Sequence, residues 1–155
     1  MIDPPEIAQT TVQPAALIHA IVPRDEIQNV MGPTIREVFE TIAAQGIASA
    51  GPWFTHHRRR PAETFDFEIS VPVATAIAPA GNVQPGEWPA MKVIRTVYQG
   101  PYEGLGEAWG EFLDWIETNG LKTADDLWEC YLGGPESSPD PATWRTQLNR
   151  QLIGE

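Results

Sequence analysis

The sequence is poor in cysteine and in basic residues. Cys130 is the only cysteine among 155 residues, which excludes an internal disulfide. Lysine and arginine total 10 against 21 aspartates and glutamates, giving a formal net charge of -11. This charge disfavours binding to nucleic acid or to an anionic membrane surface, because both would be repelled. It favours a partner that carries positive charge.

Long hydrophobic runs are also absent. No apolar segment approaches the roughly 20 residues that a membrane-spanning helix needs. The first five residues, MIDPP, lack the basic and apolar regions of a signal peptide. We therefore expect a cytoplasmic protein. With 42% hydrophobic and 20% charged residues, the composition is that of one globular domain spanning residues 1–155.

Two segments of the chain resemble each other. Residues 37–47 (EVFETIAAQGI) align with residues 111–121 (EFLDWIETNGL), and each segment ends a helical pattern of apolar residues. The stripes consist of Ile35, Val38, Phe39 and Ile42 in the first copy and of Trp109, Phe112, Leu113 and Ile116 in the second. Gly46 and Gly120 are placed to end the two helices in a left-handed conformation.

Strand patterns flank both predicted helices. In the first half we expect strands at residues 16–22, 52–58 and 65–73, and in the second half at 91–99, 126–132 and 143–152, with the second helix over 105–118. Each half is thus β-α-β-β. The segment 74–89, which contains three prolines and two glycines, is predicted to be a linker between repeat one (about 12–73) and repeat two (about 90–152).

The predicted fold class is therefore α+β. One small sheet with one helix leaves much apolar surface open, so we expect the tandem β-α-β-β repeats to pack with pseudo-two-fold symmetry. The result would be an antiparallel sheet with two main helices and a central ligand cleft between the repeats.

Glu129 lies in the middle of the strand pattern DLWECYL. Glutamate is depleted from strands, so Glu129 either faces water or is retained for function. Alternation places Leu127, Glu129 and Tyr131 on one face of the strand and Trp128 with its alternate neighbours on the other. A desolvated carboxylate tends to take up a proton, and an arriving cation reverses that tendency. Binding at Glu129 would then favour cationic ligands.

Four motifs in order connect the chain to a known family. They are GPWF (51–54), FDFEISVPV (65–73), YQGPYEGL (98–105) and WECYL (128–132) followed by WRTQL (144–148). Together they resemble the GyrI-like family of small-molecule effector-binding domains, over about residues 12–152. The segment before residue 16 has no helix-turn-helix pattern, so we expect a stand-alone member without a DNA-binding domain.

The resemblance implies that bulky, hydrophobic, often cationic aromatic molecules bind in the cleft, with Glu129 as the acidic contact and Tyr131 beside it. At the corresponding positions of the first repeat lie Thr55 and His57, so only one half supplies the carboxylate. The aromatic candidates for the walls of the cleft, each of which also suits a plain core position, are Trp53, Phe54, Tyr98, Trp109, Phe112 and Trp144.

Other chemistries lack support in the sequence. His56 and His57 are adjacent on a predicted strand and therefore point to opposite faces, which disfavours a shared metal ion. The basic run Arg58–Arg60 suits a solvated hairpin end. The segment 104–109 begins like a dinucleotide motif but has Trp109 at the third glycine position. We expect no cofactor and no metal.

Three functions remain open. The first is a binding protein for hydrophobic or cationic small molecules. The second, implied by the resemblance, is a hydrolase of cyclopropane-bearing electrophilic cytotoxins in which Glu129 and Tyr131 are catalytic. The third is a protein-interaction module that contacts a DNA topoisomerase.

Overall fold

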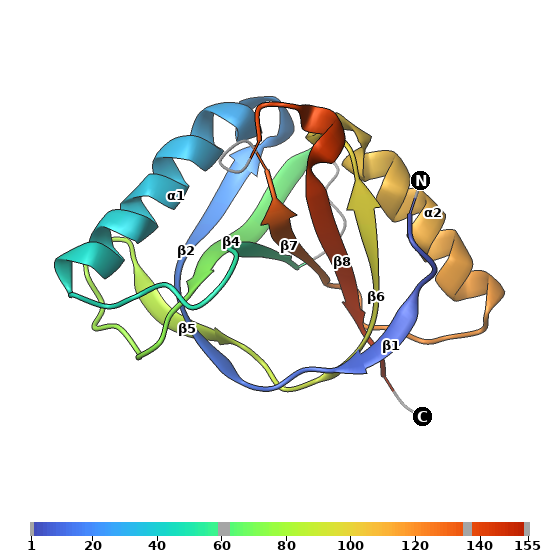
Figure 1. Cartoon of the computed structure of the whole chain (residues 1–155), viewed down its shortest axis with the longest axis horizontal. Coiled ribbons are helices and arrows are strands. Elements are labelled where there is room, and N and C mark those ends of the chain that lie inside the picture. The colour runs from blue at the N-terminus through green and yellow to red at the C-terminus, as the bar shows by residue number, and fades with distance from the viewer. Residues whose placement is uncertain (1, 59–62, 135–137, 154–155) are drawn as a thin grey trace. The chain divides into compact units, whose positions relative to one another are not determined.

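The computed structural model describes residues 2–58, 63–134 and 138–153. The chain divides into two compact units, one formed by residues 11–90 and the other by residues 1–10 together with 91–155. The strands pair antiparallel within each unit, and each unit contains one long helix (Figure 1). The α+β class is confirmed.

The unit of residues 11–90 contains four strands in the spatial order β5-β2-β4-β3. Along the chain its elements are β2 (Gln13–Pro23), η1 (Arg24–Glu26), α1 (Ile27–Ala44), β3 (Phe54–His57), β4 (Thr64–Pro72) and β5 (Gln84–Trp88). The apolar stripe of α1 packs on one face of the sheet, where Val38 and Ile42 meet Ile18 and Val71 (Figure 1). This burial stabilises the helix against the strands.

The second unit has the same strand order, β1-β6-β8-β7. Its elements are β1 (Glu6–Gln9), β6 (Lys92–Gln99), η2 (Tyr102–Gly104), α2 (Leu105–Thr118), β7 (Leu127–Gly133), η3 (Pro141–Thr143) and β8 (Arg145–Gln151). Phe112 and Ile116 of α2 pack against Ile94, Leu127 and Leu148 of the strands.

The internal repeat is confirmed element by element. The series β2-α1-β3-β4 and β6-α2-β7-β8 both follow the predicted β-α-β-β order. In each unit a further short strand pairs with the first strand of the repeat, β5 with β2 and β1 with β6. The two units are therefore copies of one four-stranded arrangement.

The segment of residues 74–89, which was predicted to be a linker, contains a strand. Residues 84–88 form β5, and Ile77 and Val83 are buried in the core beneath α1. This strand was not predicted because it contains Pro85 and Gly86, and proline and glycine are typical of turns. Proline is tolerated here because β5 is an edge strand, and Gly86 lies where the Leu17 side chain leaves no room for a Cβ atom.

The first helix is longer than its apolar stripe indicated. It begins at Ile27, eight residues before Ile35, and continues through Pro33. Strand β1 was not predicted, because its four residues, EIAQ, are mostly exposed and form no clear pattern.

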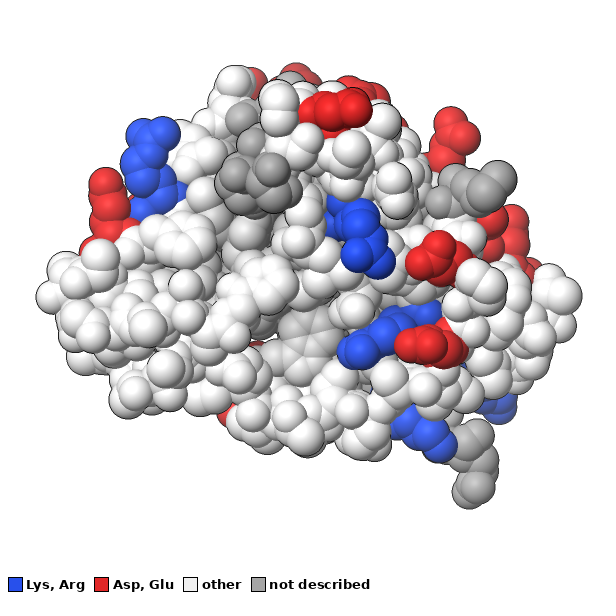
Figure 2. Space-filling model, viewed as in Figure 1, with Lys and Arg blue, Asp and Glu red and all other residues white. Residues whose placement is uncertain are grey.

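Charged side chains cover only part of the surface. On the face drawn in Figure 2 most of the surface is uncharged, and both basic and acidic side chains occur on it. No helix within the described ranges is long and apolar enough to cross a membrane.

Candidate functional site

Glu129 is buried on the face of the sheet that α2 covers. Its side chain is 9% exposed, and its strand neighbour Leu127 belongs to the core cluster that includes Phe112 of α2. The alternation of β7 therefore places Glu129 and Tyr131 beneath the helix. The possibility that Glu129 faces water is excluded.

Two aromatic side chains donate hydrogen bonds to the Glu129 carboxylate. The indole Nε1–H of Trp109, on α2, donates to Oε2 at 2.7 Å, and the hydroxyl of Tyr131 donates to Oε1 at 2.5 Å. Trp109 and Tyr131 are themselves only 4% and 7% exposed. A buried carboxylate oxygen without a hydrogen-bond donor would be costly, and these two donors satisfy one oxygen each.

Further aromatic rings pack next to Tyr131 and Trp109, the two side chains that hydrogen-bond to Glu129. Tyr102, from the short turn η2, meets Tyr131 edge-on at 6.0 Å between ring centroids and lies 4.9 Å from Trp144. Phe112 lies 5.7 Å from Trp109 and is fully buried. Of the predicted aromatic contacts, the structure thus brings Trp109 and Trp144 into one cluster with Tyr131, and Phe112 lies behind them in the core.

Strand β8 completes the floor of this cluster. Thr146 pairs with Tyr131 and Leu148 pairs with Glu129, so all four side chains share the face beneath α2. Thr146 is completely buried, and within the described ranges its hydroxyl has no hydrogen-bond partner. A buried hydroxyl without a partner is costly, which makes Thr146 a candidate contact for a bound molecule.

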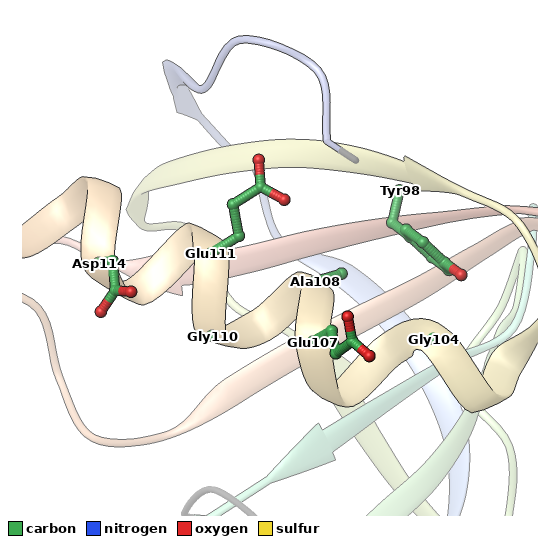
Figure 3. Close-up of a pocket in the computed structure, with 7 residues that line it drawn as sticks. All are labelled: Tyr98, Gly104, Glu107, Ala108, Gly110, Glu111 and Asp114. Carbon is green, nitrogen blue, oxygen red and sulfur yellow. The ribbon is translucent and has the colours of Figure 1, made fainter.

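Tyr98 lies beside the cluster and anchors the turn before α2. Its hydroxyl donates to the carbonyl of Pro101 at 2.9 Å. Burial and then the charges of Glu103 and Glu107 raise the pKa of this phenol. Figure 3 shows Tyr98 approaching an open depression of about 500 Å³ along α2, from which the carboxylates of Glu107, Glu111 and Asp114 project.

The remaining predicted residues belong to the unit of residues 11–90. Thr55 and His57 lie on the α1 side of that sheet, as repeat symmetry predicts for the counterparts of Glu129 and Tyr131. The hydroxyl of Thr55 is 3.0 Å from Nε2 of His57, and the His57 ring stacks on Phe67 at 5.0 Å.

The side chains of Trp53 and Phe54 lie on opposite faces of the sheet in the same unit. Trp53 is partly buried against the core beneath α1. Phe54 points to the other face and meets Trp88 edge-on at 4.9 Å.

Tyr102 was not predicted to be a site residue. The motif YQGPYEGL contains it, but it follows a proline in a predicted turn, where neither helical nor strand periodicity applies. Its position three residues after the end of β6 was the available signal.

The two adjacent histidines follow the alternation of a strand. His56 contacts Glu68 on one face of the sheet, with Nδ1 and Oε1 3.4 Å apart, while His57 points to the other face. In the parts of the chain that the structure describes, no three His, Cys, Asp or Glu side chains form a group that could hold a metal ion. Arg58 lies 3.6 Å from Asp66, and residues 59 and 60 fall outside the described ranges.

Structural comparison shows where this fold occurs. The C-terminal domain of EcmrR matches with a TM-score of 0.86 at 20% identity, covering 98% of both chains. In the EcmrR–DNA complex the match has a TM-score of 0.86 and 22% identity and covers 98% of this chain but 58% of that one. Our chain therefore spans little more than half of the EcmrR chain in that complex.

Two more distant structures have the same fold. The protein SAV2435, bound to tetraphenylphosphonium, matches with a TM-score of 0.67 at 11% identity, covering 98% of this chain and 95% of that one. A hydrolase from Listeria innocua matches with a TM-score of 0.67 at 11% identity, covering 96% and 91%. Such identities show a shared fold alone.

Family-level comparison is more direct. No curated protein sequence matches the chain significantly. The family model described as GyrI-like small molecule binding domain matches residues 3–148, nearly the whole length. The chain therefore belongs to the GyrI-like family of small-molecule-binding domains.

Proposed function

We propose that this chain binds bulky hydrophobic ligands that carry positive charge and that Glu129 is the acidic contact. The observation that supports the proposal is the buried Glu129 carboxylate, which accepts hydrogen bonds from two aromatic side chains, Trp109 and Tyr131. Both donors are neutral groups, so they hold the carboxylate within the aromatic cluster and leave it able to pair with a cation.

A lipophilic cation matches the chemistry of this cluster. Attraction between a cation and an aromatic face contributes about 0.5 to 2 kcal/mol per good contact, and Tyr102, Tyr131 and Trp144 supply adjacent rings. Apolar burial adds affinity that does not require one exact ligand shape. The binding of tetraphenylphosphonium by SAV2435, which has the same fold, agrees with this ligand class.

Entry to the cluster requires local movement, since Glu129, Trp109 and Tyr131 are all buried. Tyr102 and Trp144 are held by short segments, η2 and the residues after η3, rather than by long elements. We propose that a ligand enters by displacing these two rings. Its charged group then reaches the carboxylate, and Thr146 is available to hydrogen-bond a polar substituent.

The direct test is a fluorescence titration with tetraphenylphosphonium, compared with the neutral triphenylphosphine oxide. The chain has six tryptophans, and Trp109 touches the carboxylate itself. The key variant is Glu129→Gln, because the amide oxygen can still accept from Trp109 while its NH₂ group donates to the Tyr131 hydroxyl. The variant removes the charge and keeps the shape.

We expect Glu129→Gln to weaken tetraphenylphosphonium binding roughly tenfold or more and to leave binding of the neutral analogue nearly unchanged. Loss of both ligands to the same extent would show that the charge has no role. If the wild-type chain binds neither compound, the proposed ligand class is wrong.

Hydrolysis is a second candidate because of the short contact between Tyr131 and Glu129. A hydroxyl 2.5 Å from a carboxylate forms a pair that can exchange a proton. On a strained cyclopropane, Glu129 would take a proton from water as the water oxygen bonds to carbon. The electron pair of the broken C–C bond would take the Tyr131 proton, and the phenolate would recover a proton from Glu129.

This alternative predicts turnover rather than binding alone. Chromatography of a cyclopropane-bearing electrophile after incubation should show a product with one added water, formed by the wild-type chain and not by Glu129→Gln or Tyr131→Phe. Recovery of the intact compound after stoichiometric binding would leave the receptor function as the proposal.

A further inference from the structure

The face of the second unit's sheet that points away from α2 carries a row of polar side chains. Arg95 on β6, Asn149 on β8 and Trp128 on β7 pair across the three strands, and Gln147 pairs with Cys130 in the next row. Because side chains alternate along a strand, these residues lie opposite the face that holds Glu129. The function proposed above does not involve them.

A hydrogen-bonded chain connects three of these side chains across the two rows. The Nε–H of Arg95 donates to Oδ1 of Asn149 at 3.0 Å, and Nδ2 of Asn149 donates to Oε1 of Gln147 at 3.2 Å. Asn149 is completely buried, whereas Arg95 and Gln147 are partly buried. The buried amide therefore fixes the two outer side chains in place.

Because of the direction of these two hydrogen bonds, the groups of Arg95 and Gln147 that remain for a ligand are donors. Both amide oxygens, those of Asn149 and Gln147, already accept a hydrogen bond. Within the described ranges no acceptor bonds to the Nη groups of Arg95 or to Nε2 of Gln147, and no carboxylate forms an ion pair with Arg95. An arginine fork beside an amide NH₂ group is the donor set that a carboxylate matches.

The neighbouring groups do not compete for Arg95. Burial raises the pKa of the Cys130 thiol to about 11, against the opposing effect of the Arg95 charge, so the thiol is neutral at physiological pH. Glu6 pairs with Arg95 along β1 in the sheet register, but its exposed side chain makes no ion pair with the guanidinium. The positive charge of Arg95 remains available.

We propose that Arg95, Gln147 and the buried Asn149 form a second binding site, specific for the carboxylate of a small organic acid. The Nη groups of Arg95 would bind the two carboxylate oxygens as a fork, and Nε2 of Gln147 would donate a further hydrogen bond to one of them. Asn149 is a positioning residue that sets the direction of both donors. The apolar part of the acid would lie along the row toward Val97 and Trp128.

The site is opposite in charge preference to the Glu129 cluster and lies on the other face of the same four strands. It therefore does not depend on the function proposed for Glu129. A ligand with only a positive charge would be repelled here, and a carboxylate would be repelled at Glu129.

NMR of the full chain with naphthoate as the probe tests the site without any substitution. We expect shifts at the side-chain NH₂ group of Gln147, at Nε–H of Arg95 and at the indole N–H of Trp128. The indole N–H of Trp109, beneath α2, should not shift. Naphthylmethanol, which has the same rings and no carboxylate, should cause no comparable shifts. Shifts centred on Trp109, or equal effects of the alcohol, would overturn the proposal.

Affinity measurements add a matched pair of variants. Arg95→Gln should weaken naphthoate binding roughly tenfold or more, because a hydrogen-bonded charge partner is lost. Lys92→Gln removes the same charge from an exposed position on the same strand, with its side chain on the other face, and should change binding little. Equal losses in both variants would indicate attraction by net charge alone.

Gln147→Glu tests the site by adding a negative charge instead of removing a positive one. The new carboxylate would pair with Arg95 and should abolish naphthoate binding while keeping the polar row intact. Undiminished binding in this variant, or no saturable binding by the wild-type chain, would contradict the site. If Arg95→Gln does not fold, the NMR map and Gln147→Glu still decide the question.

Discussion

Gly46 and Gly120 leave their helices with the same backbone φ of 68°. The hydrogen bonds around them also match. Gly46 N–H donates to Ala43 and the following N–H, of Ile47, donates to Ile42, while Gly120 and Leu121 donate to Glu117 and Ile116 in the same pattern. Both helices therefore end in the same Schellman motif, in which a residue in the left-handed region closes the helix.

Replacing either glycine by alanine should destabilise the protein by about 1 kcal/mol, because a Cβ atom disfavours the left-handed conformation. Among the described residues, no atom beyond the adjoining chain lies within 4 Å of the Cβ position at Gly46 or Gly120, so the cost is one of backbone conformation. Urea denaturation of Gly46→Ala and Gly120→Ala should give similar decreases in the free energy of unfolding.

Gly106→Ala is the matched control for these variants. Gly106 lies in the first turn of α2, has no positive φ and also has open space around its Cβ position. Alanine has the higher helix propensity, so this change should leave stability equal or raise it by up to about 1 kcal/mol. A loss comparable to that of Gly120→Ala would refute the conformational explanation.

The hydrogen bond from Trp109 to Glu129 should contribute measurably to stability. In Trp109→Phe the ring is largely retained, but Oε2 of Glu129 loses the donor that lies 2.7 Å away. Leaving a buried acceptor without this partner should cost about 1 to 3 kcal/mol. Urea unfolding followed by circular dichroism measures this cost.

Trp115→Phe provides the control on the same helix. Trp115 is partly buried against the same core. Its replacement should cost clearly less than that of Trp109. In the double variant Trp109→Phe, Glu129→Gln, the added cost of Trp109→Phe should be smaller, because an amide oxygen that loses a donor is less costly than a carboxylate oxygen that does. Equal costs for the two tryptophans would mean that packing, not the hydrogen bond, explains the result.

The repeat structure was predictable because its signals are local. Apolar stripes at helical spacing and the glycines that follow them identified α1 and α2, and the ends of α2 at Leu105 and Thr118 match the prediction. Strand β5 was not predicted because Pro85 and Gly86 are residues typical of turns. That segment becomes a strand only through its pairing with β2. Pairing between distant segments is not visible in local periodicity.

In the candidate site, too, some features were predictable from local sequence patterns and others were not. Alternation along β7 placed Glu129 and Tyr131 on one face, and the helical stripe placed Trp109 toward the sheet. The hydrogen bond between Trp109 and Glu129 joins residues of different elements, so no spacing rule predicts it. Tyr102 reaches the cluster from a turn, and turns lack a period from which a side-chain direction follows.

The ion pair of His56 with Glu68 predicts a dependence of stability on pH. The hydrogen bond from His56 lowers the pKa of Glu68 below its ordinary value of 4.5, while burial opposes this effect. A carboxyl group with a lowered pKa in the folded state stabilises the protein above its unfolded-state pKa, and the contribution is lost as pH falls through the folded pKa. Wild type should therefore exceed Glu68→Gln in stability near neutral pH.

That difference should shrink as the pH falls below about 4.5 and should vanish in more acidic solution. Urea midpoints across this range test the prediction. Glu40→Gln, an exposed change on α1, serves as the control and should show little difference from wild type at any pH. A constant difference between wild type and Glu68→Gln would exclude ionisation of Glu68 as its cause.

Cys130 should react slowly with alkylating reagents even though it is only partly buried. Burial raises the pKa of its thiol to about 11. At pH 8 the reactive thiolate would then be about one part in a thousand, so alkylation should be slower than that of a free thiol by roughly two orders of magnitude. The rate of iodoacetamide modification against pH measures this directly, because the chain has no other cysteine. The same chain in concentrated urea should react at the ordinary rate.

Arg95 lowers the pKa of the thiol, so Arg95→Gln should move the rate profile of the folded protein to higher pH. A profile centred near the ordinary thiol pKa, or one that Arg95→Gln leaves in place, would show that burial and the Arg95 charge do not control this group.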